Sequence, residues 1–182
     1  ASPSPSPGSP SPRLEPARPA RYPAAMGPFL TPLDAADLAA RGVPSEWRFG
    51  MADRVRFAEL DPLRHVNHAA YLAWFEMLRV HYVRDIGLSS YDLTTGLEIV
   101  LKSIDCQYHA PMFLGEDYIV TARTVGFRRT SFRMAYAVFA PDLRVEGSAL
   151  IVLLDRDTGA KTPIPEDVRA AFVARDGAAA ES

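Results

Sequence analysis

The feature that most limits how this chain can fold is the stretch of residues 54–88, where a strand-like run, a polar turn and one long amphipathic helix follow one another. Apolar side chains recur every three or four positions across residues 69–86, which predicts a helix with a wide buried face. The face comprises Leu72, Phe75, Leu78, Tyr82 and Ile86, widened by Tyr71, Trp74 and Val83. A helix with so wide an apolar face needs a sheet to pack against.

Both ends of this helix carry recognisable boundary signals. Asp61-Pro62 ends the preceding strand, because Pro62 has no N–H to give to a ladder. Asn67 is a good N-cap, since its side chain can accept a hydrogen bond from the free N–H groups of the first turn. Gly87 suits the left-handed position after the last turn. The helix is therefore expected over residues 69–86, with a turn at residues 60–67.

Strand-like segments supply the sheet. In the first one, Val55 and Phe57 alternate with Arg54 and Arg56, which predicts a strand with one buried face. Four more β-rich segments follow the helix and are separated by turns at 111–115, 126–130 and 141–144. The expected strands are residues 47–57, 97–109, 117–125, 131–139 and 145–154. This order predicts an α+β domain with a five-stranded antiparallel sheet around one long helix.

The remaining segments set the domain boundaries. Residues 1–32 hold ten of the sixteen prolines, and a segment with so little apolar surface to bury is expected to be disordered. It is interpreted as a linker or a stretch upstream of a start at Met26. Its arginines also leave a transit peptide open, although the proline density disfavours a presequence helix. Short helices are expected at 31–41, with Pro32 near its start and Gly42 at its end, and at 166–175. We therefore expect three segments: 1–30 disordered, 31–176 a single domain with an accessory N-terminal helix, and 177–182 a disordered tail.

Charge and composition exclude several classes of function. The net charge of -2 offers no basic excess for nucleic acid, so no nucleic-acid partner is expected. No apolar run approaches the ~18–20 residues of a membrane span, so no membrane partner is expected either. The single cysteine, Cys106, cannot form an internal disulfide or a multi-cysteine metal site. It suits a reducing compartment, and we expect a cytoplasmic protein.

One acidic residue stands out for its position. Asp61 lies in the turn just before the long helix, and a carboxylate beside the free N–H groups of a helix start is suited to carbonyl chemistry. The residues alone leave open that Asp61 is only a turn or capping residue, because Asp-Pro is common in turns.

The stretch Asp61-Pro62-Leu63-Arg64-His65-Val66-Asn67-His68-Ala69-Ala70-Tyr71 resembles the D-x-x-x-H-V-N-N-x-x-Y signature of 4-hydroxybenzoyl-CoA thioesterase-like hotdog proteins. The likeness continues through residues 72–76 and Arg79, through Pro111 with Gly115, and through the segment 127–132. It covers about residues 47–154. His68 departs from the pattern, which has a second Asn there, and this position contributes mainly its backbone.

This resemblance implies a hotdog fold, in which a five-stranded sheet wraps the central helix. It also implies a homodimer or homotetramer with active sites at a subunit interface, and hydrolysis of acyl-CoA or acyl-carrier thioesters. No metal or redox cofactor is implied. CoA counts as part of the substrate and not as a cofactor. By resemblance, Asp61 is the general base or the nucleophile, and the backbone N–H of His68 is the oxyanion donor.

The same resemblance gives a set of substrate-binding candidates: His65, Asn67, Tyr71, Glu76, Arg128, Arg129 and Ser131. Each has a second interpretation. His65 can fix the loop, Asn67 can act only as a cap, and Tyr71 can be a core residue. Glu76 can pair with an arginine instead of meeting the acyl group. The hairpin residues 128–131 lie near the CoA phosphates or pantetheine in relatives, but can also form a solvated turn.

Two other functions stay open. A hotdog hydratase acting on enoyl-CoA also uses an Asp and a His, and Asp61 with His65 matches that pattern loosely. A hotdog domain can also bind acyl-CoA without turnover or serve in assembly. His81 and His109 lack partners at metal-ligand spacing and are expected to be ordinary surface or core residues, and Cys106 is expected to be a small buried side chain.

Overall fold

The computed structural model describes residues 28–89 and 97–181. The expectation of disorder for residues 1–30 falls outside this range for residues 1–27. Leu30 is described, and its N–H donates to the carbonyl of Ala52 at 2.9 Å. Five main strands and three helices make up most of the fold, with a short 3₁₀-helix, η1 (Phe57–Glu59), leading into the Asp61 loop. The strands are β2 (Gly50–Arg54), β3 (Leu97–Tyr108), β4 (Asp117–Phe127), β5 (Ser131–Ala140) and β6 (Asp142–Asp155), and the helices are α1 (Ala35–Ala39), α2 (His68–Asp85) and α3 (Glu166–Asp176).

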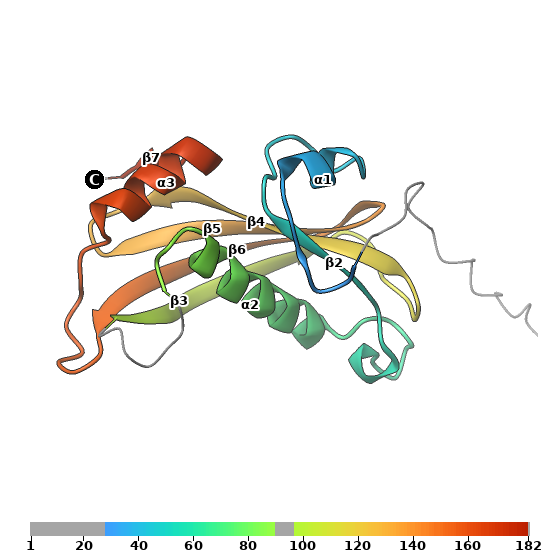
Figure 1. The fold of residues 1–182 in the computed structure, drawn as a ribbon. Helices are drawn as coiled ribbons and strands as arrows, with labels where there is room; N and C mark the ends of the chain where they lie inside the picture. The colour runs from blue at the N-terminus through green and yellow to red at the C-terminus, as the bar shows by residue number, and fades with distance from the viewer. Residues whose placement is uncertain (1–27, 90–96, 182) are drawn as a thin grey trace, which may run out of the picture.

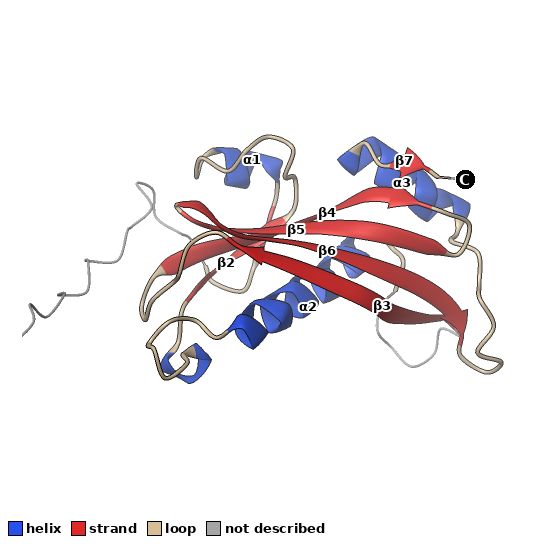
Figure 2. Ribbon diagram, turned by 180° about the vertical axis from the view of Figure 1, so that it is seen from behind, coloured by secondary structure: helices blue, strands red, loops and turns tan. Residues whose placement is uncertain are grey.

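The sheet runs in the order β1-β2-β4-β5-β6-β3, so that β3 forms one outer edge. The main strands pair antiparallel, as the sequence predicts. Two short strands extend the sheet: β1 (Pro32–Leu33) pairs with β2, and β7 (Ala179–Ala180) pairs in parallel with β4. Helix α2 crosses one face of the sheet, as Figure 1 and the reverse view in Figure 2 show. The predicted α+β architecture is therefore confirmed.

Two hydrophobic cores lie on the two faces of the sheet. On β4, Tyr118, Val120 and Ala122 belong to the main core with α2, while Ile119 belongs to a second core with Leu38 of α1. Because successive strand residues point to opposite faces, α1 covers the face away from α2. Helix α3 joins the main core, where Phe172 packs on Phe127 and Phe132 beyond the end of α2.

Three predictions near the N-terminus are wrong, and the second core explains the first of them. Strand β2 is buried at residues 50–53 on both faces, so it does not show a simple alternation. Phe57, predicted to lie on the buried face, is 80% exposed because the chain has already turned into η1. Pro32 lies in β1 and not in the expected helix at 31–41, because Asp34 caps α1 and sets its start at Ala35.

Two other boundaries differ from the sequence expectation. The turn expected at 141–144 is tighter, since Ala140 pairs with Asp142 and only Pro141 separates β5 from β6. The tail expected to be disordered is ordered through Glu181, whose N–H donates to the carbonyl of Phe127 at 2.8 Å. Pairing with the edge of β4 is the reason, because it satisfies backbone groups that would otherwise be open.

Candidate active site

The loop of residues 60–67 holds Asp61 through its own backbone. Oδ1 of Asp61 accepts hydrogen bonds from the N–H groups of Leu63 at 2.8 Å and His65 at 3.1 Å. The N–H of Asp61 donates to the carbonyl of His65 at 2.8 Å, which closes the loop. Arg64 takes a left-handed conformation with φ of 64° to allow this. One carboxylate oxygen of Asp61 is therefore used by the turn.

The second oxygen of Asp61 is available for chemistry. Oδ2 makes no hydrogen bond to any of the residues that the structure describes. The two interpretations of Asp61 drawn from its sequence position are therefore compatible, since Oδ1 organises the turn and Oδ2 is left to meet a proton or a substrate atom. A carboxylate fixed through one oxygen is oriented without losing its basic function.

Helix α2 starts directly after this loop. The Asn67 side chain caps it, as predicted, and accepts from the N–H of Ala69 at 2.9 Å. The N–H of His68 has no acceptor among residues 28–89 and 97–181. An unpaired N–H in the first turn carries the positive end of the helix dipole, so it can stabilise a developing negative charge.

Asp61 and His68 line the same cavity, of about 330 Å³. His65 and Tyr71, two of the predicted substrate-binding residues, line it too. The remaining wall comes from the end of β3 and the segment after it, and the full lining is Asp61, His65, Val66, His68, Tyr71, Tyr108, His109, Ala110 and Pro111. The signature segment thus folds into one side of a single cavity.

The sequence did not predict the second wall of the cavity, which Tyr108 and His109 line. His109 was expected to be unremarkable, but it lines this cavity, and its Nε2 lies 2.9 Å from Oε2 of Glu146. Tyr108 lies beside it, and its hydroxyl is 3.4 Å from the carbonyl of His68. These residues reach the site because β3 ends at Tyr108, beside the first turn of α2. No local pattern around them signals that position.

The aromatic residues give the cavity a neutral wall. Tyr71 is buried, and its ring meets that of Tyr108 edge-on at 5.5 Å between centroids. Burial raises the pKa of Tyr71 well above its ordinary value, with Tyr108 adding to the shift. Its phenol therefore stays protonated in any working range of pH. The ring of His65 packs edge-on against Phe113 at 5.2 Å, while its backbone closes the loop.

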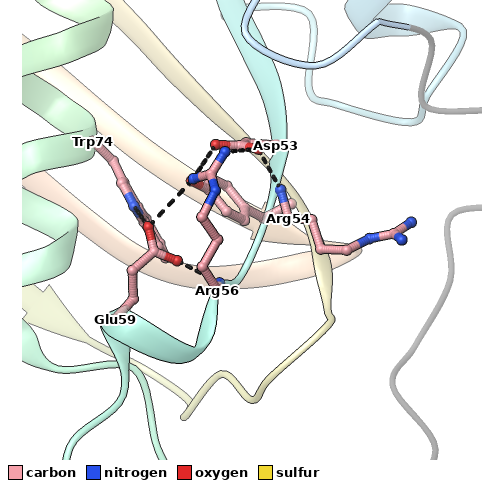
Figure 3. A network of polar contacts seen from close by, with 6 residues as sticks. Asp53, Arg54, Arg56, Glu59 and Trp74 are labelled. Atoms are coloured by element: carbon pink, nitrogen blue, oxygen red, sulfur yellow. Dashed lines mark hydrogen bonds and ion pairs between the residues drawn. The ribbon is translucent and has the colours of Figure 1, made fainter.

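A partly buried polar network holds the segment that leads into the loop (Figure 3). The Arg56 guanidinium lies between Asp53, which is 2% exposed, and Glu59, with Nη1 2.8 Å from Oδ2 of Asp53. Oε1 of Glu59 accepts from Nε1 of Trp74 at 2.9 Å, and the carbonyl of Glu59 accepts from the N–H of Asn67. The hydrogen bond to Asp53 raises the pKa of Arg56. The network ties β2, η1 and α2 together around the loop.

Two predicted contacts point elsewhere in this single chain. Asn67 lines a different groove, beside Glu59, Ala70 and Trp74. The side chain of Glu76 is 72% exposed and lies 3.9 Å from Arg79, so the interpretation of an arginine pair fits it. Neither residue lines the cavity of Asp61.

The hairpin residues form a separate cavity at the opposite end of the sheet. Arg128, Arg129 and Ser131 line a space of about 410 Å³. On β6, the partner of Tyr108 is Val145 and the partner of Ser131 is Val152, which separates the two ends by about 23 Å along the strand. One chain therefore does not bring the hairpin to Asp61.

Metal ligation has no support in the described part of the chain, where no group of three or more His, Cys, Asp or Glu side chains could hold a metal ion. Within the same residues, no helix is both long enough and apolar enough to cross a membrane.

Comparison with known proteins identifies the family. The model of the thioesterase-like superfamily matches residues 55–172, which include the cavity and the whole of α2. The chain belongs to the thioesterase-like superfamily. The resemblance noted at residues 61–71 is thus confirmed, and so is the hotdog fold.

Two solved structures and one curated sequence illustrate this membership. A thioesterase-superfamily protein from Jannaschia sp. CCS1 is 46% identical, with a TM-score of 0.82, covering 86% of this chain and 100% of that chain. A thioesterase from Thermus thermophilus, crystallised with coenzyme A and zinc, is 34% identical with a TM-score of 0.62, covering 70% and 93%. The acyl-CoA thioesterase candidate YneP from Bacillus subtilis (strain 168) is 25% identical over 57% of this chain and 78% of its own length.

Proposed function

We propose that this protein hydrolyses acyl-CoA thioesters to a free carboxylic acid and CoA. The observation that carries the proposal is that Asp61 and His68 line one cavity. Among residues 28–89 and 97–181, neither Oδ2 of Asp61 nor the N–H of His68 has a hydrogen-bond partner. Thioester hydrolysis needs both, because a nucleophile must be activated and the negative charge on the carbonyl oxygen must be stabilised.

In this mechanism the thioester carbonyl accepts a hydrogen bond from the N–H of His68. Oδ2 of Asp61 either removes a proton from water as the water attacks the carbonyl carbon, or attacks that carbon directly to form an anhydride that water then opens. Both routes break the carbon–sulfur bond and release CoA as a thiol. Losing one oxyanion donor of this kind typically costs ~10²–10³ in rate.

The CoA class is favoured over other thioesters by two relatives. The Thermus thermophilus protein was crystallised with coenzyme A, and YneP bears an acyl-CoA thioesterase name. Within this chain, the basic hairpin of Arg128 and Arg129 offers guanidinium groups that suit phosphates. We propose that these residues and Ser131 contact the phosphate and pantetheine parts of the substrate.

A homodimer would bring the hairpin of one subunit close to Asp61 of the other. Strand β3 ends the sheet order, so no strand in the described part of the chain pairs with its outer edge. Antiparallel pairing of β3 with the β3 of a second copy places the Leu97 end of one beside the Tyr108 end of the other. The hairpin of the second copy would then lie at the Asp61 end of the first, and each active site would draw on two subunits.

The test is thiol release from a panel of acyl-CoA esters of graded length plus one aromatic ester, read with a thiol reagent and followed by chromatography of the acyl product. We expect free CoA and the carboxylic acid in equal amounts. Addition of water to an enoyl-CoA with the thioester intact would indicate the hydratase instead. Tight binding of esters without either product would indicate a binding domain, and both results would overturn the proposal.

A further inference from the structure

The cavity at the β4–β5 hairpin concentrates positive charge in an acidic chain. Five cationic side chains line it, Lys102, Arg128, Arg129, Arg133 and Lys161, together with one carboxylate, Glu181. The protein as a whole has a net charge of -2. Such a local excess of positive charge creates a potential that attracts anions.

The lysines make this cavity unusual within the chain. Lys102 and Lys161 are the two lysines of the sequence, in which all eighteen other cationic side chains of the Lys/Arg type are arginine. They come from positions 59 residues apart, and both line this one cavity. Neither makes an ion pair or side-chain hydrogen bond in the described part of the chain. Two unpaired ammonium groups at one cavity are suited to a phosphate dianion, since each donates from a compact charge.

Glu181 already occupies part of the cavity as an internal counter-ion. Its carboxylate forms an ion pair with Arg133 and lies 3.6 Å from Nε of Arg128. Glu181 directly follows β7, which pairs with β4, and the N–H of Glu181 donates to the carbonyl of Phe127. These contacts fix the position of Glu181. Gly126 leaves room for it, because a Cβ at that position would collide with Oε1 of Glu181. The carboxylate is therefore held where an incoming anion would meet Arg128 and Arg133.

This counter-ion, Glu181, lies outside the part of the chain that defines the family, since the family match ends at residue 172.

The remaining lining of the cavity is suited to the rest of a nucleotide. Leu150 and Val152 supply apolar surface, while Thr130 and Ser131 supply hydroxyl groups.

We propose that this cavity binds the phosphomonoester of a nucleotide through Lys102 and Lys161, and that Glu181 sets the affinity by competing for Arg128 and Arg133. Two sources have this chemistry, the 3′-phosphate of a CoA substrate and a free phosphorylated nucleotide. The first source rests on the proposed function, whereas binding itself does not.

Calorimetry with adenosine 3′,5′-bisphosphate tests the binding step without turnover. Lys102→Gln and Lys161→Gln are exposed substitutions that leave the core untouched, and each is expected to weaken binding about tenfold, as for a charged hydrogen bond. Arg54→Gln is the control, because it removes an exposed cation that pairs with Asp117 at the far end of β4. It is expected to leave the affinity unchanged.

Two variants test the role of Glu181. Glu181→Gln removes its charge, and Gly126→Ala keeps the charge but displaces the carboxylate. Both are expected to strengthen nucleotide binding at least threefold. Weaker binding in both would show that Glu181 organises the arginines for the ligand, and would overturn the competition.

Steady-state kinetics then distinguish the sources. If the ligand is the substrate, the lysine variants raise KM for an acyl-CoA and leave KM for the matching acyl-3′-dephospho-CoA unchanged. If the ligand is a free nucleotide, both KM values stay the same while nucleotide binding measured by calorimetry is still weakened. Equal nucleotide affinity in wild type and both lysine variants would overturn the site. Absence of any thiol release with intact nucleotide binding would instead overturn the proposed function alone.

Discussion

Nε1 of Trp74 donates a hydrogen bond of 2.9 Å to Oε1 of Glu59, and this bond joins the central helix to the segment that leads into the Asp61 loop. The Trp74 ring also stacks on Tyr118 with 4.1 Å between centroids. Glu59 holds the other end of the loop as well, since its carbonyl accepts from the N–H of Asn67. One carboxylate and one ring therefore set where the loop lies relative to α2.

Replacing Trp74 with Phe tests this connection. Trp74→Phe keeps an aromatic ring against Tyr118 but removes the donor to Glu59, so we expect a loss of about 1–2 kcal/mol in the free energy of unfolding. Urea titration measures it, and kcat should fall as the loop loosens. Glu59→Gln is the companion variant, since it keeps an acceptor for Trp74 and loses the charge facing Arg56. An unchanged free energy of unfolding in Trp74→Phe would show that the hydrogen bond from Trp74 to Glu59 does not stabilise the fold.

The cap of α2 is tested at Asn67. Asn67→Ala removes the acceptor for the N–H of Ala69 and is expected to destabilise the protein by about 0.5–2 kcal/mol. Asn67→Asp retains an acceptor and a favourable charge at the helix start, so its stability should stay near that of the wild type. Thermal unfolding of both variants gives the comparison. Equal losses in Ala and Asp would mean that Asn67 acts through something other than its cap.

Packing between α2 and the sheet is tested at Gly147. A Cβ at this position would lie 2.6 Å from Cε2 of Phe75, whose ring is stacked on Tyr136. Because the ring is fully buried and must shift to admit a Cβ, Gly147→Ala is expected to destabilise the protein by about 1–3 kcal/mol. Ser148→Ala, at the exposed neighbouring residue, is the control and should change stability by less than ~0.5 kcal/mol. A neutral Gly147→Ala would show that the ring can shift.

The shared active site is tested by mixing two damaged proteins. Asp61→Asn loses the carboxylate, and the double variant Arg128→Ala with Arg129→Ala is expected to lose affinity for CoA esters. If each site uses Asp61 of one subunit and the hairpin of its partner, random exchange restores about a quarter of wild-type activity at substrate concentrations below KM. Sites confined to single chains would give no recovery after subunit exchange.

The sequence could predict one side of the candidate site because that side is a single continuous segment. Asp61, His65, His68 and Tyr71 follow one another through a turn and the start of a helix, and local rules place them together. Tyr108 and His109 could not be found this way. They reach the cavity through the register of β3 against β6, a relationship between distant segments that leaves no trace in the residues nearby.

The fold was predictable for a similar reason. The period of the apolar residues gave α2 and four of the strands to within three residues at each end. The pattern failed at β2 and the N-terminal segment, because the second core around Leu38 and Ile119 buries both faces there. It also failed at residues 177–181, where an alanine-rich tail becomes a strand only because the edge of β4 accepts it.

The proposed role of Asp61 Oδ2 as catalytic base or nucleophile is tested by kcat of Asp61→Asn on the best acyl-CoA substrate. Asparagine retains an oxygen that can accept from Leu63 and His65, so the loop and the melting temperature should be preserved. We expect kcat to fall at least ~10²-fold, as for the loss of a positioned general base. A correctly folded variant that turns over within threefold of the wild type would contradict it.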